Sequence, residues 1–221
     1  MDDQRHARSS SSPSVKIVEL THRKRGRPGE EIRVVLADAS SFFISRRVWE
    51  QAPFHEDEEL SVGRWEQILS TSRFHVAYNR ALSLLSRQEH SRFLLHQKLR
   101  QRQLDEQSIV HALDSLEDAG YLDDARFAES WARSRLRSHP EGRAVLVERL
   151  RERGVRADLA EQTIDRLLHE NEAAFIDSAS RFVEKILRRT TPSREEIVDK
   201  LYRRGFSRAI IGEVMHRHSI D

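Results

Sequence analysis

The apolar positions of this chain recur with a period of 51 residues from about residue 77 to the C-terminus. Leu99, Leu150 and Leu201 show this spacing, and no gap is needed to maintain it. Further sets follow the same step: Leu95, Leu146 and Ile197; Leu104, Val155 and Phe206; Leu113, Ile164 and Met215; Ala77, Ala128 and Ala179; Leu85, Leu136 and Leu187. Such a period is typical of stacked supersecondary units that cannot bury their apolar faces alone. The pattern predicts a mainly α-helical, elongated array of three tandem repeats.

Within each unit the apolar spacing predicts three helices. The first has apolar residues at i, i+4 and i+8, as in Ala128, Ala132 and Leu136, and the others continue this helical spacing. The second helices are expected to begin and end at equivalent positions, starting at Ser91, Gly142 and Ser193 and stopping at Gln103, Gly154 and Gly205. Glycine supplies the left-handed conformation of a helix end at the last two of these stops.

Short runs of β-branched and aromatic residues precede the repeats, at residues 15–20, 32–36 and 42–44. They predict a small antiparallel β-module, with a basic hairpin tip at residues 22–30. One helical turn is expected at residues 48–52 and an acidic loop at residues 55–59. Ser61 is placed to cap the first long helix.

The expected organisation follows from these patterns. It comprises a disordered tail (1–14), the β-module (15–60), a linker helix with repeat 1 (61–124), repeat 2 (125–172) and repeat 3 (173–221).

Composition agrees with thin helical layers that expose much surface. Of the 221 residues, 38% are apolar and 33% are charged, but the net charge is only +2, so any argument about polyanions depends on how the charges are distributed. The chain has no cysteine, which excludes disulfides and cysteine-based catalysis or zinc sites. No apolar run is long enough to span a membrane, and the N-terminus does not resemble a secretory signal. We expect a cytoplasmic protein.

Basic residues also follow the repeat, at three positions of each unit. The equivalent sets are Arg92, Arg143 and Arg194; Lys98, Arg149 and Lys200; and Arg102, Arg153 and Arg204. One interpretation is structural, with stems that cover the core edge and heads that pair with acidic third helices. The other is functional, with the second helices forming a basic stripe. Arginines that are not fully matched by the repeat thicken the basic side: Arg133, Arg135, Arg137, Arg151, Arg188, Arg189 and Arg203. A basic stripe can bind phosphate backbones or an acidic protein groove.

No catalytic constellation is found. Asp123 and Asp124 precede a predicted helix, where aspartate caps free N–H groups. His216 and His218 lack further ligands, and Trp131 has the spacing of a core residue. The sequence therefore predicts no enzyme activity, no cofactor and no metal site.

Residues 120–133, GYLDDARFAESWAR, strongly resemble the hallmark segment of the RecX regulatory proteins. Residues 98–102, 149–155 and 200–206 resemble the recurring K-L-x-x-[RK]-G-hydrophobic unit of that family. The resemblance covers roughly residues 74 to 221. Gln103 stands where the family has glycine, and Phe93-Leu94-Leu95 departs from its usual Ser-x-x-Glu-Leu pattern.

This resemblance implies a non-catalytic modulator, mostly an inhibitor, of the RecA recombinase. Such proteins dock in the groove of the RecA–single-stranded DNA filament and affect strand exchange, ATP hydrolysis, DNA repair, recombination and the SOS response. The basic positions above would form the filament- or DNA-binding surface of a protein expected to act as a monomer.

Two alternatives stay open. One is a helix-turn-helix module that binds duplex DNA independently of RecA. The other is an interaction scaffold with neither activity. The sequence also leaves open whether DNA is contacted directly.

Overall fold

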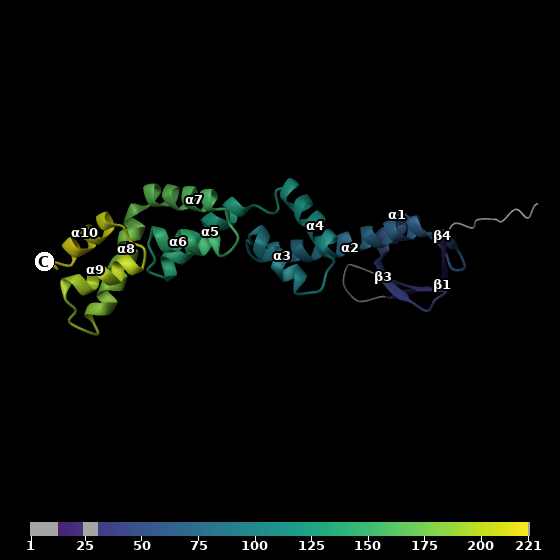
Figure 1. Ribbon diagram of the computed structural model, residues 1–221, viewed down its shortest axis with the longest axis horizontal. Coiled ribbons are helices and arrows are strands. Elements are labelled where there is room, and N and C mark those ends of the chain that lie inside the picture. Colours follow the sequence, from purple (N-terminus) through teal and green to yellow (C-terminus); the bar gives the residue numbers. More distant parts are fainter. Residues whose placement is uncertain (1–12, 24–30, 221) are drawn as a thin grey trace, which may run out of the picture. The chain divides into compact units, whose positions relative to one another are not determined.

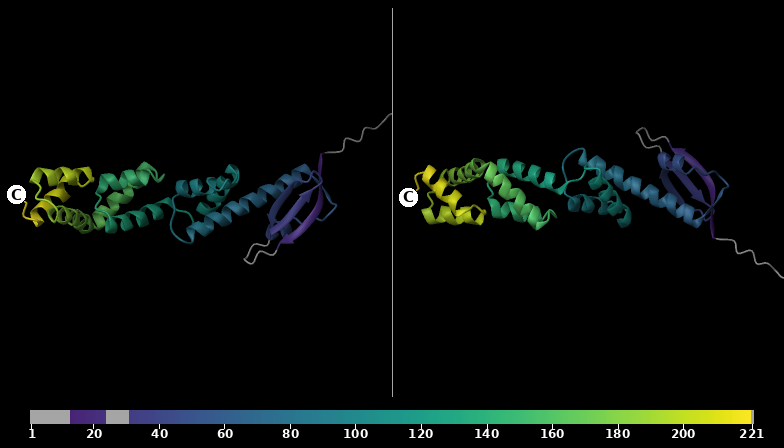
Figure 2. Two further views of the ribbon diagram at one scale, coloured as in Figure 1. Left: turned by 90° about the horizontal axis from the view of Figure 1, so that it is seen from below. Right: turned by 90° about the horizontal axis from the view of Figure 1, so that it is seen from above.

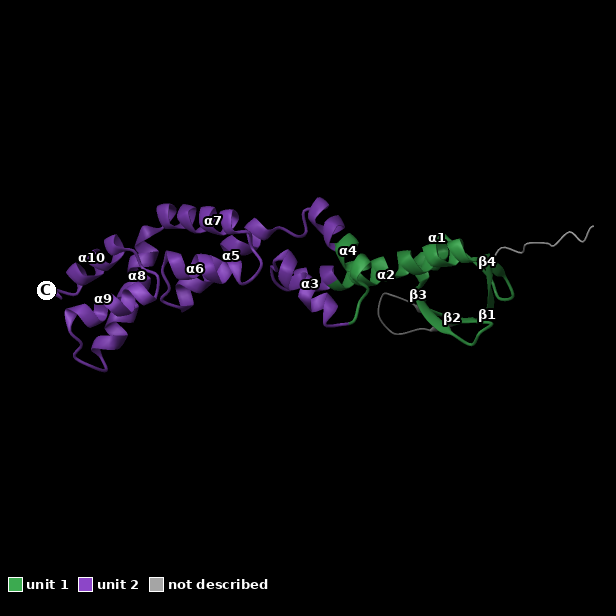
Figure 3. Cartoon of the chain, viewed as in Figure 1, with its two compact units in different colours: residues 1–80, 103–112 green, residues 81–102, 113–221 purple. Residues whose placement is uncertain are grey.

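A computed structural model of the chain describes residues 13–23 and 31–220 (Figure 1). The predicted disordered tail up to residue 12 and the tip of the predicted basic hairpin, residues 24–30, lie outside the described residues. The chain forms two compact units, one of residues 1–80 and 103–112 and the other of residues 81–102 and 113–221 (Figure 3).

Unit 1 contains a four-stranded antiparallel sheet in the order β3-β2-β1-β4. Its elements are β1 (Ser14–Arg23), β2 (Glu31–Leu36), β3 (Ser41–Ser45), α1 (Arg46–Gln51) and β4 (Glu59–Ser61). The β-module is thus confirmed, but the sequence analysis missed β4. This strand has only three residues, too few to show an alternating pattern.

One face of this sheet is apolar and packs on the first turns of α2 (Val62–Leu85), as Figure 2 shows. Alternate residues of β2 (Ile32, Val34 and Leu36) are buried, as expected for a sheet with one covered face. Trp65 of α2 packs edge-on against Phe42, with ring centroids 5.4 Å apart. Ser61 Oγ accepts a hydrogen bond from Arg64 N, so the predicted cap is confirmed.

The rest of the chain is helical, in the three groups of three that the 51-residue period predicts. The remaining helices are α3 (Arg92–Arg100), α4 (Glu106–Asp118), α5 (Asp124–Ser138), α6 (Arg143–Arg151), α7 (Ala157–Glu170), α8 (Glu172–Leu187), α9 (Arg194–Arg203) and α10 (Arg208–Arg217). We call α2–α4 repeat 1, α5–α7 repeat 2 and α8–α10 repeat 3. The three-helix repeats and the small N-terminal sheet confirm the predicted fold class.

The turn after each second helix takes the same left-handed conformation. Gln103, Gly154 and Gly205 have φ angles of 59°, 79° and 81°. Repeat 1 therefore keeps the backbone geometry of the others although it lacks the glycine. A non-glycine residue at positive φ carries some strain, which glycine avoids.

Successive repeats are joined in register. Ser91 Oγ, at the start of α3, donates to Arg153 O at 2.5 Å, and Gly142 N, at the start of α6, donates to Arg204 O at 2.8 Å. Both donor and acceptor advance by 51 residues between these two bonds. The starts of α3 and α6 thus contact the turns that follow α6 and α9, respectively.

The two aspartates before α5 have different roles. Asp123 Oδ1 accepts from Ala125 N at 2.8 Å and from Arg126 N at 3.1 Å, which confirms the cap of α5. Asp124 Oδ1 instead accepts from Arg92 N at 2.7 Å, so it caps α3 of the preceding repeat. Its carboxylate is half-buried, and burial raises the pKa of Asp124 although the bond from Arg92 N opposes this change.

We predict that Asp124→Asn raises the free energy of unfolding at neutral pH, because it removes a carboxylate charge whose burial is unfavourable. The asparagine oxygen can still accept from Arg92 N, but no charge is buried. Because the folded pKa lies above the ordinary 3.8, the stability due to this group is complete below that pH and is lost as the pH rises through the folded pKa. Urea denaturation at several pH values should show that the variant lacks this loss.

Asp123→Asn is the matched control, because asparagine is also a good N-cap residue. We expect it to change stability by less than about 0.5 kcal/mol. A neutral-pH loss of stability in Asp124→Asn alone would mean that the helix N-termini favour the charge more than burial opposes it.

Candidate nucleic-acid interface

The first set of repeat-matched arginines is neutralised in two repeats and not in the third. Arg92 contacts Asp114 at 2.6 Å and Glu117 at 2.5 Å, on α4. Arg143 makes a two-pronged ion pair with Asp165 on α7. These pairs match the structural interpretation, in which third-helix carboxylates neutralise second-helix cations. In repeat 3 the carboxylate position is His216, and Arg194 is exposed without an ion pair among the described residues.

The second set shows the same change from repeat 2 to repeat 3. Arg149 Nε lies 3.0 Å from Glu141 Oε1. The position of Glu141 is occupied by His90 in repeat 1 and by Pro192 in repeat 3. Lys98 and Lys200 therefore lack this carboxylate, and neither makes an ion pair within the described part of the chain. Lys98 instead adds its charge to burial in lowering the pKa of His90.

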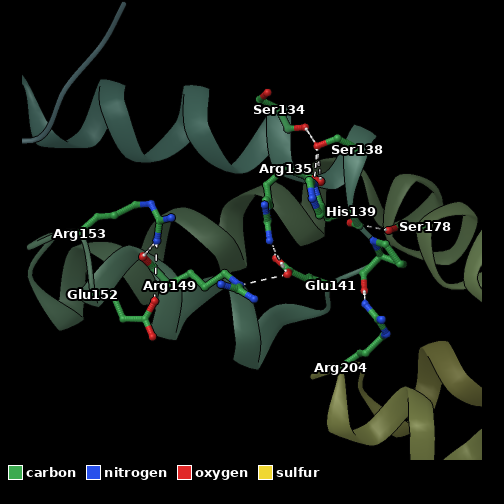
Figure 4. Close-up of polar contacts among 11 residues, drawn as sticks. Ser134, Arg135, Ser138, His139, Glu141, Arg149, Glu152, Arg153, Ser178 and Arg204 are labelled. Atoms are coloured by element: carbon green, nitrogen blue, oxygen red, sulfur yellow. Dashed lines mark hydrogen bonds and ion pairs between the residues drawn. The ribbon is translucent and has the colours of Figure 1, made fainter.

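Glu141 is the centre of a buried ionic cluster between α5 and α6 (Figure 4). Arg135 donates to both of its oxygens at 2.8 Å, and Arg149 approaches from α6. Burial by itself would raise the pKa of Glu141, but the hydrogen bonds and charge of Arg135, with the charge of Arg149, lower it. Glu141 is only 4% exposed, so these two arginines serve repeat 2 and are not free cations.

The third set stacks on aromatic rings. Arg153 lies over Trp131 at 4.5 Å, and Arg204 over Phe182 at 4.1 Å, so this cation–π pair also repeats after 51 residues. Trp131 is a partly buried residue at the core edge, close to the expected core position. The equivalent aromatic position in repeat 1 is Arg80, and Arg102 is exposed.

The arginines outside the period are mostly paired on the surface. Arg133 contacts Glu129 at 2.9 Å and Glu170 at 3.5 Å. Arg151, Arg188 and Arg203 pair within their own helices with Glu148, Glu184 and Asp199. Such exposed pairs contribute little stability and can exchange partners. Arg189 is exposed and lies in the cleft described next.

A basic cleft of about 860 Å³ lies between repeats 2 and 3. It is lined by the end of α5, the second half of α8 and the end of α9. Six of its residues are cationic and none is acidic: Arg137, Arg181, Lys185, Arg189, Lys200 and Arg204. The structure thus brings together four residues of the predicted basic side, Arg137, Arg189, Lys200 and Arg204. The other predicted residues lie outside this cleft.

Two cleft cations, Arg181 and Lys185, are absent from the predicted basic side. Arg181 and Lys185 do not follow the 51-residue repeat of basic residues, because the equivalent residues in the other repeats are uncharged. The spacing of basic residues along α8 nevertheless indicates a basic helix face. Arg181, Lys185 and Arg189 are spaced at i, i+4 and i+8, which places them on one face of α8 and just beyond its end.

The described residues contain no group of three or more histidine, aspartate or glutamate side chains that could hold a metal ion. His218 caps the end of α10, next to His216. None of the described helices is long and apolar enough to cross a membrane.

Comparison with known proteins gives a consistent family. A family model described as the second three-helix domain of RecX matches residues 123–164, and the model of the first three-helix domain matches residues 77–116. The regulatory protein RecX of Halorhodospira halophila is 36% identical over 131 residues, which are 58% of this chain and 78% of that protein. The RecX of Prosthecochloris aestuarii is 29% identical over 147 residues, covering 66% of this chain and 96% of the relative.

Solved structures share the fold. A crystal structure of regulatory protein RecX has a TM-score of 0.68 at 21% identity and covers 91% of this chain and 99% of that one. RecX from Lactobacillus salivarius has a TM-score of 0.58 at 24% identity, covering 68% of this chain and 99% of that one. From these sequence matches, the chain belongs to the RecX family of regulatory proteins.

Proposed function

We propose that the chain regulates the RecA recombinase by binding the RecA–single-stranded DNA filament as a monomer, mostly as an inhibitor of ATP hydrolysis and strand exchange. It catalyses no reaction itself and acts in the cytoplasm, in DNA recombination, repair and the SOS response. Family membership supports a regulatory role, and the resemblance described above supplies RecA as the target.

One observation carries the proposal beyond the family name. Consecutive repeats are joined by hydrogen bonds between equivalent residues, from Ser91 Oγ to Arg153 O and from Gly142 N to Arg204 O. Equivalent second-helix cations are therefore presented in a regular series. Within the described residues, four members of that series make no ion pair: Lys98, Arg102, Arg194 and Lys200. Second-helix cations without ion pairs, in the first and the last of three tandem repeats, suit an extended and negatively charged partner.

The test is ATP hydrolysis by RecA on single-stranded DNA, titrated with the full chain. We expect inhibition by the wild type. For Arg102→Glu/Arg194→Glu we expect half-inhibition to need roughly tenfold more protein at low salt, with a smaller difference at high salt because salt screens exposed charges. Arg156→Glu/Arg166→Glu carries the same charge change at residues that already pair with Asp158 and Glu129, and should inhibit almost as the wild type does.

Unchanged ATP hydrolysis at saturating wild-type protein would contradict the proposal. A mobility-shift assay with duplex DNA separates it from the alternative. Sequence-specific duplex binding in the absence of RecA would favour a free-standing DNA-binding module.

A further inference from the structure

Repeats 2 and 3, which border the basic cleft, differ in how their second-helix cations are neutralised. Wherever repeat 2 places a second-helix cation, it supplies an internal partner: Asp165 for Arg143, Glu141 for Arg149 and Trp131 for Arg153. Repeat 3 keeps the cations and replaces both carboxylates, with His216 and Pro192. Arg194 and Lys200 therefore lack the carboxylates that neutralise Arg143 and Arg149 in repeat 2.

Two of the cleft arginines are held in place by backbone carbonyl groups. Arg181 Nη2 donates to Leu136 O at 2.9 Å, and Arg204 Nη1 donates to Pro140 O at 3.1 Å. Each guanidinium uses one of its nitrogens in this way and keeps further N–H donors for an external group. A fixed guanidinium loses less side-chain entropy on binding than a mobile one, and its planar fork matches a phosphate.

The partial negative charge at the helix C-termini is too small to account for the six cations of the cleft. The ends of α5, α8 and α9 all contribute to the cleft. A helix C-terminus carries roughly half a negative charge, so three of them offset only about one and a half cations. Exposed Lys185, Lys200, Arg137 and Arg189 have no carboxylate in the cleft lining. The cleft keeps a strong positive potential.

We propose that this cleft binds the phosphodiester backbone of a single nucleic-acid strand directly. The inference rests on the proposed function for its setting, since that function places the chain on single-stranded DNA. Helices α5, α8 and α9 each contribute cations to the cleft lining, so these cations would surround one strand. The convex surface of a duplex would contact only the rim of the cleft. Binding through phosphates is independent of base sequence and depends strongly on salt.

The experiment measures binding of a fluorescein-labelled oligothymidylate to the full chain by fluorescence anisotropy, without RecA. We expect Lys185→Glu/Lys200→Glu to weaken binding about 50-fold at roughly 50 mM salt, and to reduce the steepness of the log–log salt dependence by about 1.4, the value for two lost single-strand phosphate contacts. Both lysines are exposed and without ion pairs in the described structure, so the variant should melt at nearly the wild-type temperature.

The matched control is Arg156→Glu/Arg166→Glu. These residues are outside the predicted interface, are 78% and 54% exposed, pair with Asp158 and Glu129, and do not line the cleft. The charge change is identical, and we expect affinity within about threefold of the wild type, since phosphate contacts decide the effect. An equal loss in the control would overturn the inference, because net charge and not the cleft would then be responsible.

Other outcomes also decide. Displacement of the oligonucleotide by poly-glutamate as effectively as by unlabelled strand would assign the cleft to an acidic protein segment and overturn the inference. Preference for duplex over single strand would do the same. If the wild type does not bind the oligonucleotide but still inhibits RecA, the inference about the cleft is overturned and the proposed function is not. The two proposals can therefore fail separately.

Discussion

Replacing Gly142 by alanine is expected to lower the free energy of unfolding by about 3 kcal/mol, the upper part of the usual range for overpacking a tight contact. A Cβ at Gly142 would lie under 3.0 Å from the carbonyl group of Gly205 and from Phe206 N. These are backbone atoms, which cannot rotate away as a side chain can. The bonds from Gly142 N to Arg204 O and from Ala144 N to Gly205 O would be lost when the chain shifts.

Urea denaturation measures the total loss, and amide hydrogen exchange shows where it occurs. We expect faster exchange at Gly142 and Ala144, because repeat 3 undocks from repeat 2. Gly212→Ala is the control. Gly212 lies within α10 with no atom within 4 Å of an added Cβ, so alanine should stabilise by about 0.5–1 kcal/mol. Equal stability of Gly142→Ala and the wild type would show that repeats 2 and 3 do not meet at Gly142 and Gly205.

Glu141→Gln is expected to cost about 2 kcal/mol at neutral pH. The side chain keeps its size, but the charge that binds Arg135 and Arg149 is removed, and hydrogen bonds to charged groups contribute roughly 1.5–3 kcal/mol. The partial exposure of both arginines keeps the loss below the 3–5 kcal/mol typical of a fully buried broken pair. Thermal and urea denaturation would measure it.

The pH dependence identifies the cause. The folded pKa of Glu141 lies below its ordinary 4.5, so its stabilisation is complete above that pH and is lost as the pH falls through the folded pKa. Wild type and variant should therefore converge in acid. Glu148→Gln removes an exposed carboxylate that pairs with Arg151 at 3.0 Å, and should cost less than about 0.5 kcal/mol. A difference that persists unchanged into acid would exclude the charge of Glu141 as its source.

These two variants also guide the choice of functional substitutions. Arg149 and Arg153 belong to the predicted interface, but one pairs with Glu141 and the other stacks on Trp131. Charge reversal at either would disturb repeat 2 itself, so a loss of binding would have two causes. Arg102, Arg194, Lys185 and Lys200 are without such internal partners in the described structure, and they test binding separately from folding.

Local periodicity determined much of this protein. The 51-residue step places Leu99, Leu150 and Leu201 in three equivalent helices, and all three are fully buried. Helix starts at Ser91 and Ser193 and the left-handed residue Gly154 were also predictable, because caps and turns depend on a few neighbouring residues. The short strand β4 was not, because its pairing with β1 spans 45 residues.

Only the tertiary structure decided which cations are free. Equivalent arginines look alike in the sequence, yet Arg143 is neutralised by Asp165, whereas histidine (His216) occupies the equivalent position in the repeat of Arg194. Whether a carboxylate neutralises a cation depends on the distance between side chains on different helices, which spacing along one helix does not give. The cleft joins non-repeating Arg181 and Lys185 to Lys200 of the repeat by the same long-range packing. The sequence thus set the positions of the basic residues, and the packing of repeat 3 on repeat 2 determined which of them can meet a phosphate.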